Sequence, residues 1–157
     1  MAPPLFVDLS AVDLSKVTFG VDAIEAVNPQ RGDMRMLDAV VCVNQEDRTF
    51  VAFKDVRDDE FWVPGHIPGR PLFPGVMMIE AAAQCAGFMM KTYMKIPGFV
   101  GFAGVDKVKF RGQVVPGDRF IILGKMIDLR PRRSVCSVQG VVNGNLVFEG
   151  TVTGMPI

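Results

Sequence analysis

The sequence predicts an α+β domain in which a curved antiparallel β-sheet wraps around one long buried central helix. Three observations predict this fold class. A helical segment that begins near Val76 is apolar on nearly all sides, so it needs cover in most directions. Two strand-like segments precede the helix and four follow it, joined mostly by strong turn signals. A chain of 157 residues is long enough for one domain with a sizeable core.

The elements before the helix can be assigned in chain order. Residues 1–20 are expected to be a loosely attached N-terminal extension, which leaves 21–157 as a single domain. Residues 21–27 predict one or two helical turns. Residues 36–44 and 48–56 predict the two strands of a hairpin, because both are rich in Val, Phe or Thr and an acidic turn separates them. Polar and apolar residues alternate imperfectly in the second strand, so both of its faces are expected to be partly covered.

A Pro/Gly-rich loop leads into the helix. Residues 61–75 hold four prolines and three glycines, a density that no helix or central strand tolerates. Residues 76 to about 91 consist largely of good helix formers, and Glu80 is the only charge between Val76 and Met90. Only ~15 apolar residues remain after the prolines, whereas a membrane span needs ~20. The helix is therefore expected to lie inside the protein.

The C-terminal part is predicted to be entirely β. Four candidate strands cover 102–115, 119–129, 134–142 and 146–153, and turn signals such as the Asn-Gly pair at 143–144 predict a meander. A sheet of this kind wrapped around one helix is called a hotdog fold.

Composition excludes several classes of protein. The 17 basic and 17 acidic residues cancel, which argues against a dedicated nucleic-acid binder. The three cysteines are far apart and the single histidine cannot build a His-rich zinc site, so neither a metal nor a cofactor is expected. The N-terminus lacks the basic region of a signal peptide, and together with the cysteine pattern this favours a reducing, cytoplasmic location.

Glu80 is the residue that stands out in the helix. A carboxylate without a partner there would be costly to ionise, and a carboxyl that stays protonated near neutral pH is a competent general acid. Gln84 lies four residues further along, on the same helical face, and can hydrogen-bond the carboxyl. The alternative is that Glu80 forms a structural ion pair with an arginine.

His66 and the start of the helix are further candidates. His66 lies in the Pro/Gly loop, where an imidazole can act as a base near neutral pH; the alternative is an exposed loop histidine. Gly75 begins the helix, where backbone N–H groups without partners can hold an oxygen that gains negative charge. The alternative is an ordinary helix start.

Residues 61–84 together resemble the signature of the (3R)-hydroxyacyl-acyl-carrier-protein dehydratases of fatty acid synthesis. The stretch GHIPGRPLFPGVMMIEAAAQ is similar to the family pattern GHFPxxPxxPGVxxxEAxAQ, whose Glu form is typical of the branch without isomerase activity. Flanking segments are also similar, so the resemblance covers roughly residues 21–155. Trp62, Ile67 and residues 32–34 depart from the family pattern, which leaves the preferred acyl chain length open.

The resemblance implies a mechanism. His66 would remove the C2 proton of a 3-hydroxyacyl thioester, and Glu80 would protonate the departing C3 hydroxyl, giving a trans-2-enoyl thioester and water. Gln84 would orient Glu80, and the backbone at Gly75 and Val76 would stabilise the thioester oxygen. Family sites form across a homodimer, often assembled into a trimer of dimers, with the histidine from one subunit and the glutamate from the other.

The acyl chain and its carrier need further surfaces. An apolar tunnel for the chain is expected from side chains that would suit the core equally well, namely Met77, Phe88, Phe99 and Phe102. Residues 101–133 carry eight basic and three acidic residues, so these strands are a candidate docking surface for an acidic acyl carrier protein. The alternative is a solvated strand face. The docking candidates are Lys107, Lys109, Arg111, Arg132 and Arg133.

Two other functions remain open at this point. One is another hotdog enzyme that acts on acyl thioesters, such as a thioesterase, and the other is a non-catalytic acyl-binding protein. The sequence does not decide between an acyl carrier protein and coenzyme A as the carrier of the thioester, or between a dimer and a hexamer.

Overall fold

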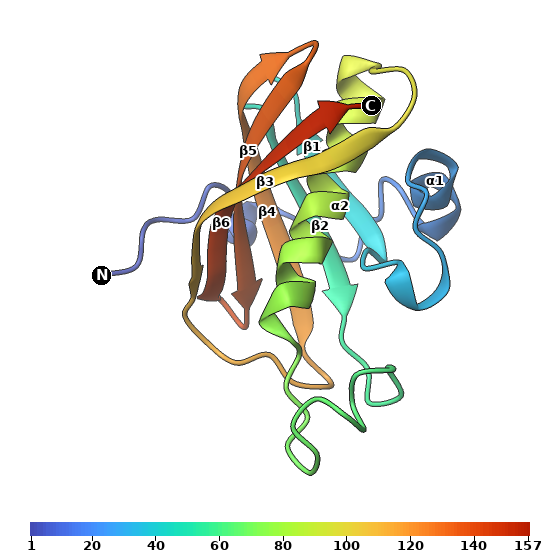
Figure 1. Cartoon of the computed structure of the whole chain (residues 1–157). Coiled ribbons are helices and arrows are strands. Elements are labelled where there is room, and N and C mark those ends of the chain that lie inside the picture. Colours follow the sequence, from blue (N-terminus) through green and yellow to red (C-terminus); the bar gives the residue numbers. More distant parts are fainter.

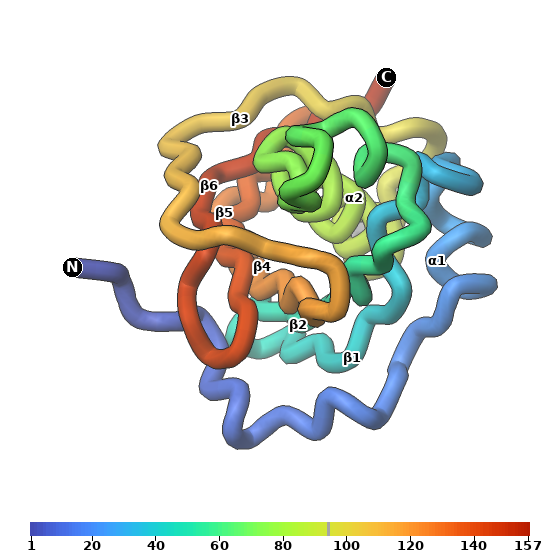
Figure 2. Tube along the Cα trace, turned by 90° about the horizontal axis from the view of Figure 1, so that it is seen from below, coloured from blue at the N-terminus to red at the C-terminus, as the bar shows by residue number. Residues whose placement is uncertain are grey.

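The computed structural model describes residues 1–157, apart from the side chain of Met94. Figure 1 shows one antiparallel sheet of six strands with a single long helix lying across it. The elements in chain order are α1 (Val21–Val27), β1 (Ala39–Asn44), β2 (Thr49–Asp55), α2 (Gly75–Met94), β3 (Val100–Phe110), β4 (Arg119–Arg130), β5 (Arg133–Val142) and β6 (Asn145–Pro156), with short 3₁₀ turns at Leu9–Ala11 and Gly32–Met34. Viewed from below, the strands curl around α2 (Figure 2). The predicted hotdog fold is confirmed.

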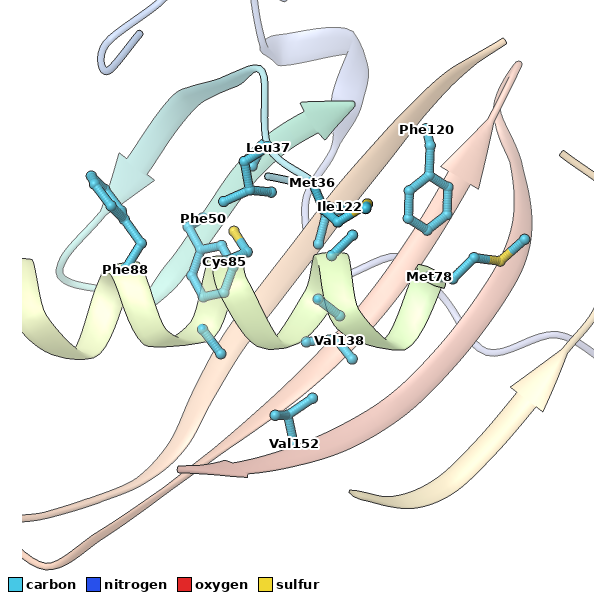
Figure 3. Packing of buried hydrophobic residues seen from close by; sticks show 14 of the residues in the cluster. Met36, Leu37, Phe50, Met78, Cys85, Phe88, Phe120, Ile122, Val138 and Val152 are labelled. Atoms are coloured by element: carbon cyan, nitrogen blue, oxygen red, sulfur yellow. The ribbon is translucent and has the colours of Figure 1, made fainter. Parts of the chain in front are cut away.

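Small side chains on α2 allow the helix to lie close to the sheet. Ala81, Ala82, Cys85 and Ala86 are almost completely buried, and large side chains from the strands fill the space around them. Phe50, Phe120, Ile122 and Val138 belong to this core, and Figure 3 shows them gathered along the helix. The helix therefore depends on tertiary packing, as its apolar surface predicts.

The strand order corrects the predicted meander. The sheet runs β1-β2-β4-β5-β6-β3, so β4, β5 and β6 form a meander, but β3 pairs with β6 at the edge of the sheet. The turn at residues 116–118 does not make a hairpin. Gly117 donates to Val56 O (2.8 Å) and Val56 donates to Asp118 O (3.0 Å), so the turn joins the chain to the end of β2. The strand before it ends at Phe110, not Val115.

The N-terminal segment is not loosely attached, contrary to expectation. Apolar side chains between Leu5 and Leu14 cover a second apolar cluster, which lies on the other face of β1, β2 and β4 and includes Val51 and Leu123. Buried Gln139 accepts a hydrogen bond from Phe6 N–H and donates one to Pro4 O, each 2.9 Å long. We call residues 4–19 the N-terminal strap. Its packing explains why both faces of β2 are apolar.

Helix α2 is the longest helix of the described chain, and it belongs to the core. None of the helices described is long and apolar enough to cross a membrane.

Candidate active site

His66 is held in the Pro/Gly loop by two short hydrogen bonds. Its backbone N–H donates to Trp62 O at 2.7 Å, and its ring Nδ1 lies 2.8 Å from Leu72 O. A carbonyl oxygen only accepts, so the hydrogen-bond network assigns the proton of the neutral ring to Nδ1. This tautomer leaves the Nε2 lone pair available to take a proton. The residue after the histidine, Ile67, has φ of 59°, a strained value for a β-branched residue.

Glu80 is held by Gln84, as the helical spacing predicts. Gln84 Nε2 donates to Glu80 Oε1 at 2.8 Å and to Met34 O at 2.7 Å, while Gln84 Oε1 accepts from Met36 N–H at 2.9 Å. Gln84 is only 4% exposed, so its amide is locked between the helix and the segment before β1. Because the amide cannot turn freely, its N–H group holds the Oε1 atom of Glu80 in one position.

The alternative reading of Glu80 as half of an arginine ion pair is wrong. In the chain as described, the ion pairs of Arg and Lys are made with other carboxylates, and none includes Glu80. Glu80 instead lines a pocket between α2, β3 and β6, together with Gln84, Phe99 and Phe102. Glu80 itself is partly buried, and the pocket is lined by both apolar and polar side chains.

His66 opens into a different hollow, at the N-terminal end of α2. Gly75, Val76, Met78 and Phe110 also line it. Gly75 and Val76 provide the first N–H groups of the helix, and neither group has an acceptor among the described residues. One chain therefore places His66 beside free helix N–H groups but does not bring His66 and Glu80 into one cavity.

Residues 28–151 match the family model of the FabA-like domain. The chain belongs to this family. Among curated relatives, 3-hydroxyacyl-(acyl-carrier-protein) dehydratase FabZ of Streptococcus thermophilus is 37% identical over 138 residues, which cover 87% of this chain and 96% of that protein. The FabZ of Streptococcus gordonii is 38% identical over 134 residues, covering 85% and 94%.

Solved structures confirm the fold of this FabA-like chain. The dehydratase heterocomplex ApeI:P from Xenorhabdus doucetiae superposes with a TM-score of 0.71 at 16% identity, covering 85% of this chain and 90% of that one. The protein Cj0977 from Campylobacter jejuni gives a TM-score of 0.68 at 13% identity, covering 93% and 96%.

Two of the four predicted tunnel residues line a pocket of the single chain, and the other two do not. Phe99 and Phe102 line the Glu80 pocket and are about half exposed in the single chain. Phe88 is instead a core residue, 1% exposed, and packs edge-on against Phe19. Met77 packs against the core and lines neither hollow of this FabA-like chain. Helical spacing alone does not distinguish residues of the core from residues that line a pocket.

The five basic docking candidates do not form one patch. In the sheet, Lys109 on β3 lies opposite Glu149 on β6, and Glu149 lies opposite Gln139 in the middle of β5. Arg133 is at the start of β5. The candidates on or just after β3 are thus several residues away, along the strand direction, from Arg132 and Arg133. Arg111 lies next to the His66 hollow, but it donates to Glu149 at 2.8 Å, and this bond raises the pKa of the guanidinium. Arg133 lies 3.5 Å from Asp128.

Sequence reasoning missed the residues that support Gln84. Buried Asn28 donates from Nδ2 to Gln84 O at 3.0 Å, and the backbone of Met34 and Met36 binds the Gln84 amide. Gln30 lines the Glu80 pocket, and its Oε1 is a buried atom without a hydrogen-bond partner in the part of the chain described. The only available signal was that residues 29–38 resemble a flanking segment of the dehydratases.

Proposed function

We propose that this FabA-like protein dehydrates (3R)-3-hydroxyacyl thioesters carried on an acyl carrier protein, giving trans-2-enoyl thioesters and water in fatty acid synthesis. Identity of 37% to curated FabZ dehydratases over most of both chains supports the reaction. The observation that carries the proposal is a matched pair of groups: His66 with Nε2 left free by the Leu72 bond, and Glu80 held by Gln84. Two titratable groups in unlike environments suit opposite acid and base roles.

In this proposal His66 begins the reaction. Nε2 takes the C2 proton of the substrate, and negative charge develops on the thioester oxygen. The unpaired N–H groups of Gly75 and Val76, at the positive end of α2, are suited to stabilise that charge. A side chain on Gly75 would meet Phe110, since an added Cβ would lie 2.8 Å from the ring, so glycine keeps this end of the helix accessible.

Glu80 completes the reaction. Its carboxyl gives a proton to the C3 hydroxyl, the C3–O bond breaks, and water leaves as the C2–C3 double bond forms. The bond from Gln84 holds one carboxyl oxygen, so the other is free to face the substrate. The C2 proton remains on His66 and must return to solvent or to Glu80 before the next turnover.

We propose that the site is completed by a second copy of the chain. His66 and Glu80 line different hollows, so a protomer alone lacks an acid and a base facing one cavity. β3 is an edge strand, and Phe99, Phe102 and Phe110 on or beside it are about half exposed. An unpaired edge with apolar side chains is suited to pairing. A homodimer is therefore expected, and the family resemblance implies a trimer of dimers as its further assembly.

Of the five basic docking candidates, three lie near the His66 hollow. Lys107, Lys109 and Arg111 lie on or just after β3, next to Phe110 and Gly112 of that hollow. We propose these three residues, and not Arg132 and Arg133, as contacts for an acidic carrier protein. A cytoplasmic location accompanies the proposal, in keeping with the three free cysteines.

Purified protein incubated with 3-hydroxyacyl-carrier thioesters of several chain lengths tests the function through the ultraviolet absorbance of the enoyl product. We expect His66→Ala and Glu80→Gln each to lower kcat by about 10²-fold or more. Release of free acid would instead indicate a thioesterase. Tight acyl binding without turnover at any chain length would indicate a non-catalytic binding protein.

A further inference from the structure

A buried ion pair joins β2 to the start of the connection that carries His66. Lys54 is on β2 and Glu60 is at the start of the loop, and their side chains are only 4% and 5% exposed. Lys54 Nζ and Glu60 Oε1 are 3.1 Å apart. Lys and Glu are almost never buried to this extent unless they are paired, and replacing a buried pair with apolar residues often costs no stability. A buried ion pair is therefore weak evidence for a role in stability, and a second role is worth seeking in what the pair contacts.

Glu60 uses both of its oxygens to fix the loop. Oε1 also accepts from the backbone N–H of Arg57 at 2.8 Å, and Oε2 accepts from the indole Nε1 of Trp62 at 2.8 Å. One carboxylate thus joins the end of β2 to an aromatic residue inside the loop. Charge-assisted hydrogen bonds of this kind are shorter and stronger than hydrogen bonds between neutral groups.

Trp62 provides one of the two anchors of His66 and packs against the residue next to the other. Its carbonyl oxygen accepts the His66 backbone N–H at 2.7 Å. Its ring packs on Phe73, with ring centroids 5.7 Å apart, and Phe73 follows Leu72, whose carbonyl receives the His66 ring. A shift of Trp62 would therefore disturb both hydrogen bonds of His66.

We propose that Lys54, Glu60 and Trp62 are positioning residues for His66. The buried pair holds the Trp62 indole, and Trp62 holds the imidazole with Nδ1–H on Leu72 and Nε2 unprotonated. The effect on catalysis rests on the proposed function. The effect on the imidazole does not, because it can be read without substrate.

The single histidine of the chain gives a direct readout. Nitrogen NMR of the imidazole near pH 8 should show mainly the Nδ1–H tautomer in the native protein and a mixture of both tautomers in Glu60→Gln. The matched control is Asp59→Asn, the same chemical change one residue earlier. Asp59 forms an ion pair with Arg57, but the two side chains are 72% and 54% exposed. We expect the native tautomer in this control.

Kinetics complete the test. We expect Glu60→Gln to lower kcat by about 10- to 100-fold with KM within about twofold, because misplacing a base affects the chemical step more than binding.

If Glu60→Gln does not fold, Trp62→Phe is the second variant. It keeps an aromatic ring, removes the indole N–H and should give the same two changes, in the tautomer and in kcat. A folded variant of either kind with the native tautomer overturns the proposal, and so does one with an altered tautomer and native kcat. A shifted tautomer in a protein whose native form has no dehydratase activity would support the positioning role and count against the proposed function.

Discussion

Gln84 Nε2 lies 2.8 Å from Glu80 Oε1 and 2.7 Å from Met34 O, so the same amide group touches the proposed acid and the segment before β1. The helix supplies the four-residue spacing, and the backbone of Met34 and Met36 fixes which way the amide points. Glu80 is thus oriented by a residue that cannot rotate without breaking three hydrogen bonds.

Replacing Gln84 by Leu should therefore affect both activity and stability. We expect kcat to fall by about 10- to 100-fold because the acid loses its orientation. The free energy of unfolding should fall by about 1–3 kcal/mol because the Met36 N–H and Met34 C=O groups lose their partner. Enzyme assays and urea unfolding measure the two effects.

Gln139→Leu is the matched control for this change. Gln139 is equally buried and also has its amide bonded to the backbone, but its partners belong to the N-terminal strap. It should lose stability to a similar extent and keep the native kcat. Equal kcat values for Gln84→Leu and Gln139→Leu would contradict the orienting role of Gln84.

The sequence predicts local features of this fold better than the pairing of distant segments. α1 is found at the predicted residues, and α2 differs from its predicted bounds by only a few residues, because periodicity, Pro and Gly are local signals. The pairing of β3 with β6 was missed because the paired residues are 38 (Phe110 and Phe148) to 56 (Val100 and Pro156) positions apart and no turn indicates it. The strap was missed because its apolar residues follow no regular period.

The same distinction applies to the candidate site. The bond between Glu80 and Gln84 follows from helical spacing, but the contacts of Gln84 with Asn28, Met34 and Met36 depend on tertiary packing. Phe88 lies within α2 and Phe102 lies near the start of β3; one is in the core and the other lines a pocket. Their different burial depends on tertiary packing, which aromatic character and position in the chain do not reveal.

The strap should protect Cys42. This half-buried thiol belongs to the apolar cluster that Phe6 and its neighbours cover. Phe6→Ser removes apolar area from that cover, so it should lower the free energy of unfolding by about 1–2 kcal/mol. It should also speed alkylation of Cys42, measured by mass spectrometry. Val17→Ser, at a position that is about half exposed, is the control. Unchanged alkylation of Cys42 in Phe6→Ser would show that the strap does not cover it.

Two buried thiols should make stability fall at alkaline pH. Burial raises the pKa of Cys136 from 9.0 to about 12 and that of Cys85 well above 9.0. In the unfolded chain these thiols lose their protons near pH 9, while the folded chain keeps them. Their contribution to stability is therefore complete below about pH 9 and is lost as the pH rises toward about 12.

Urea unfolding under reducing conditions at pH 8 and pH 10 measures this loss. From pH 8 to pH 10 the free energy of unfolding should fall in both proteins. We expect the fall to be about 1 kcal/mol smaller in Cys136→Ala, because one titrating thiol has been removed. The same pH dependence in the native protein and Cys136→Ala would contradict the assignment.

Mixing two inactive variants tests whether active sites form between subunits. His66 and Glu80 line different hollows of one chain, so we expect each site to take one residue from each subunit. A dimer of one His66→Ala chain and one Glu80→Gln chain then has one site with both substitutions and one site with neither. Co-expression with random pairing should restore about a quarter of native activity, because half of the dimers carry one intact site of two.

Two controls make the mixing result decisive. Each variant alone should stay inactive, and a chain that carries both substitutions should restore nothing when it is mixed with either single variant. In a mixed dimer of that kind, each site lacks at least one of the two residues if the sites are shared. If the acid and base instead came from the same chain, both sites of a His66→Ala and Glu80→Gln pair would be defective. The absence of restored activity in verified mixed dimers would therefore place each site within a single subunit.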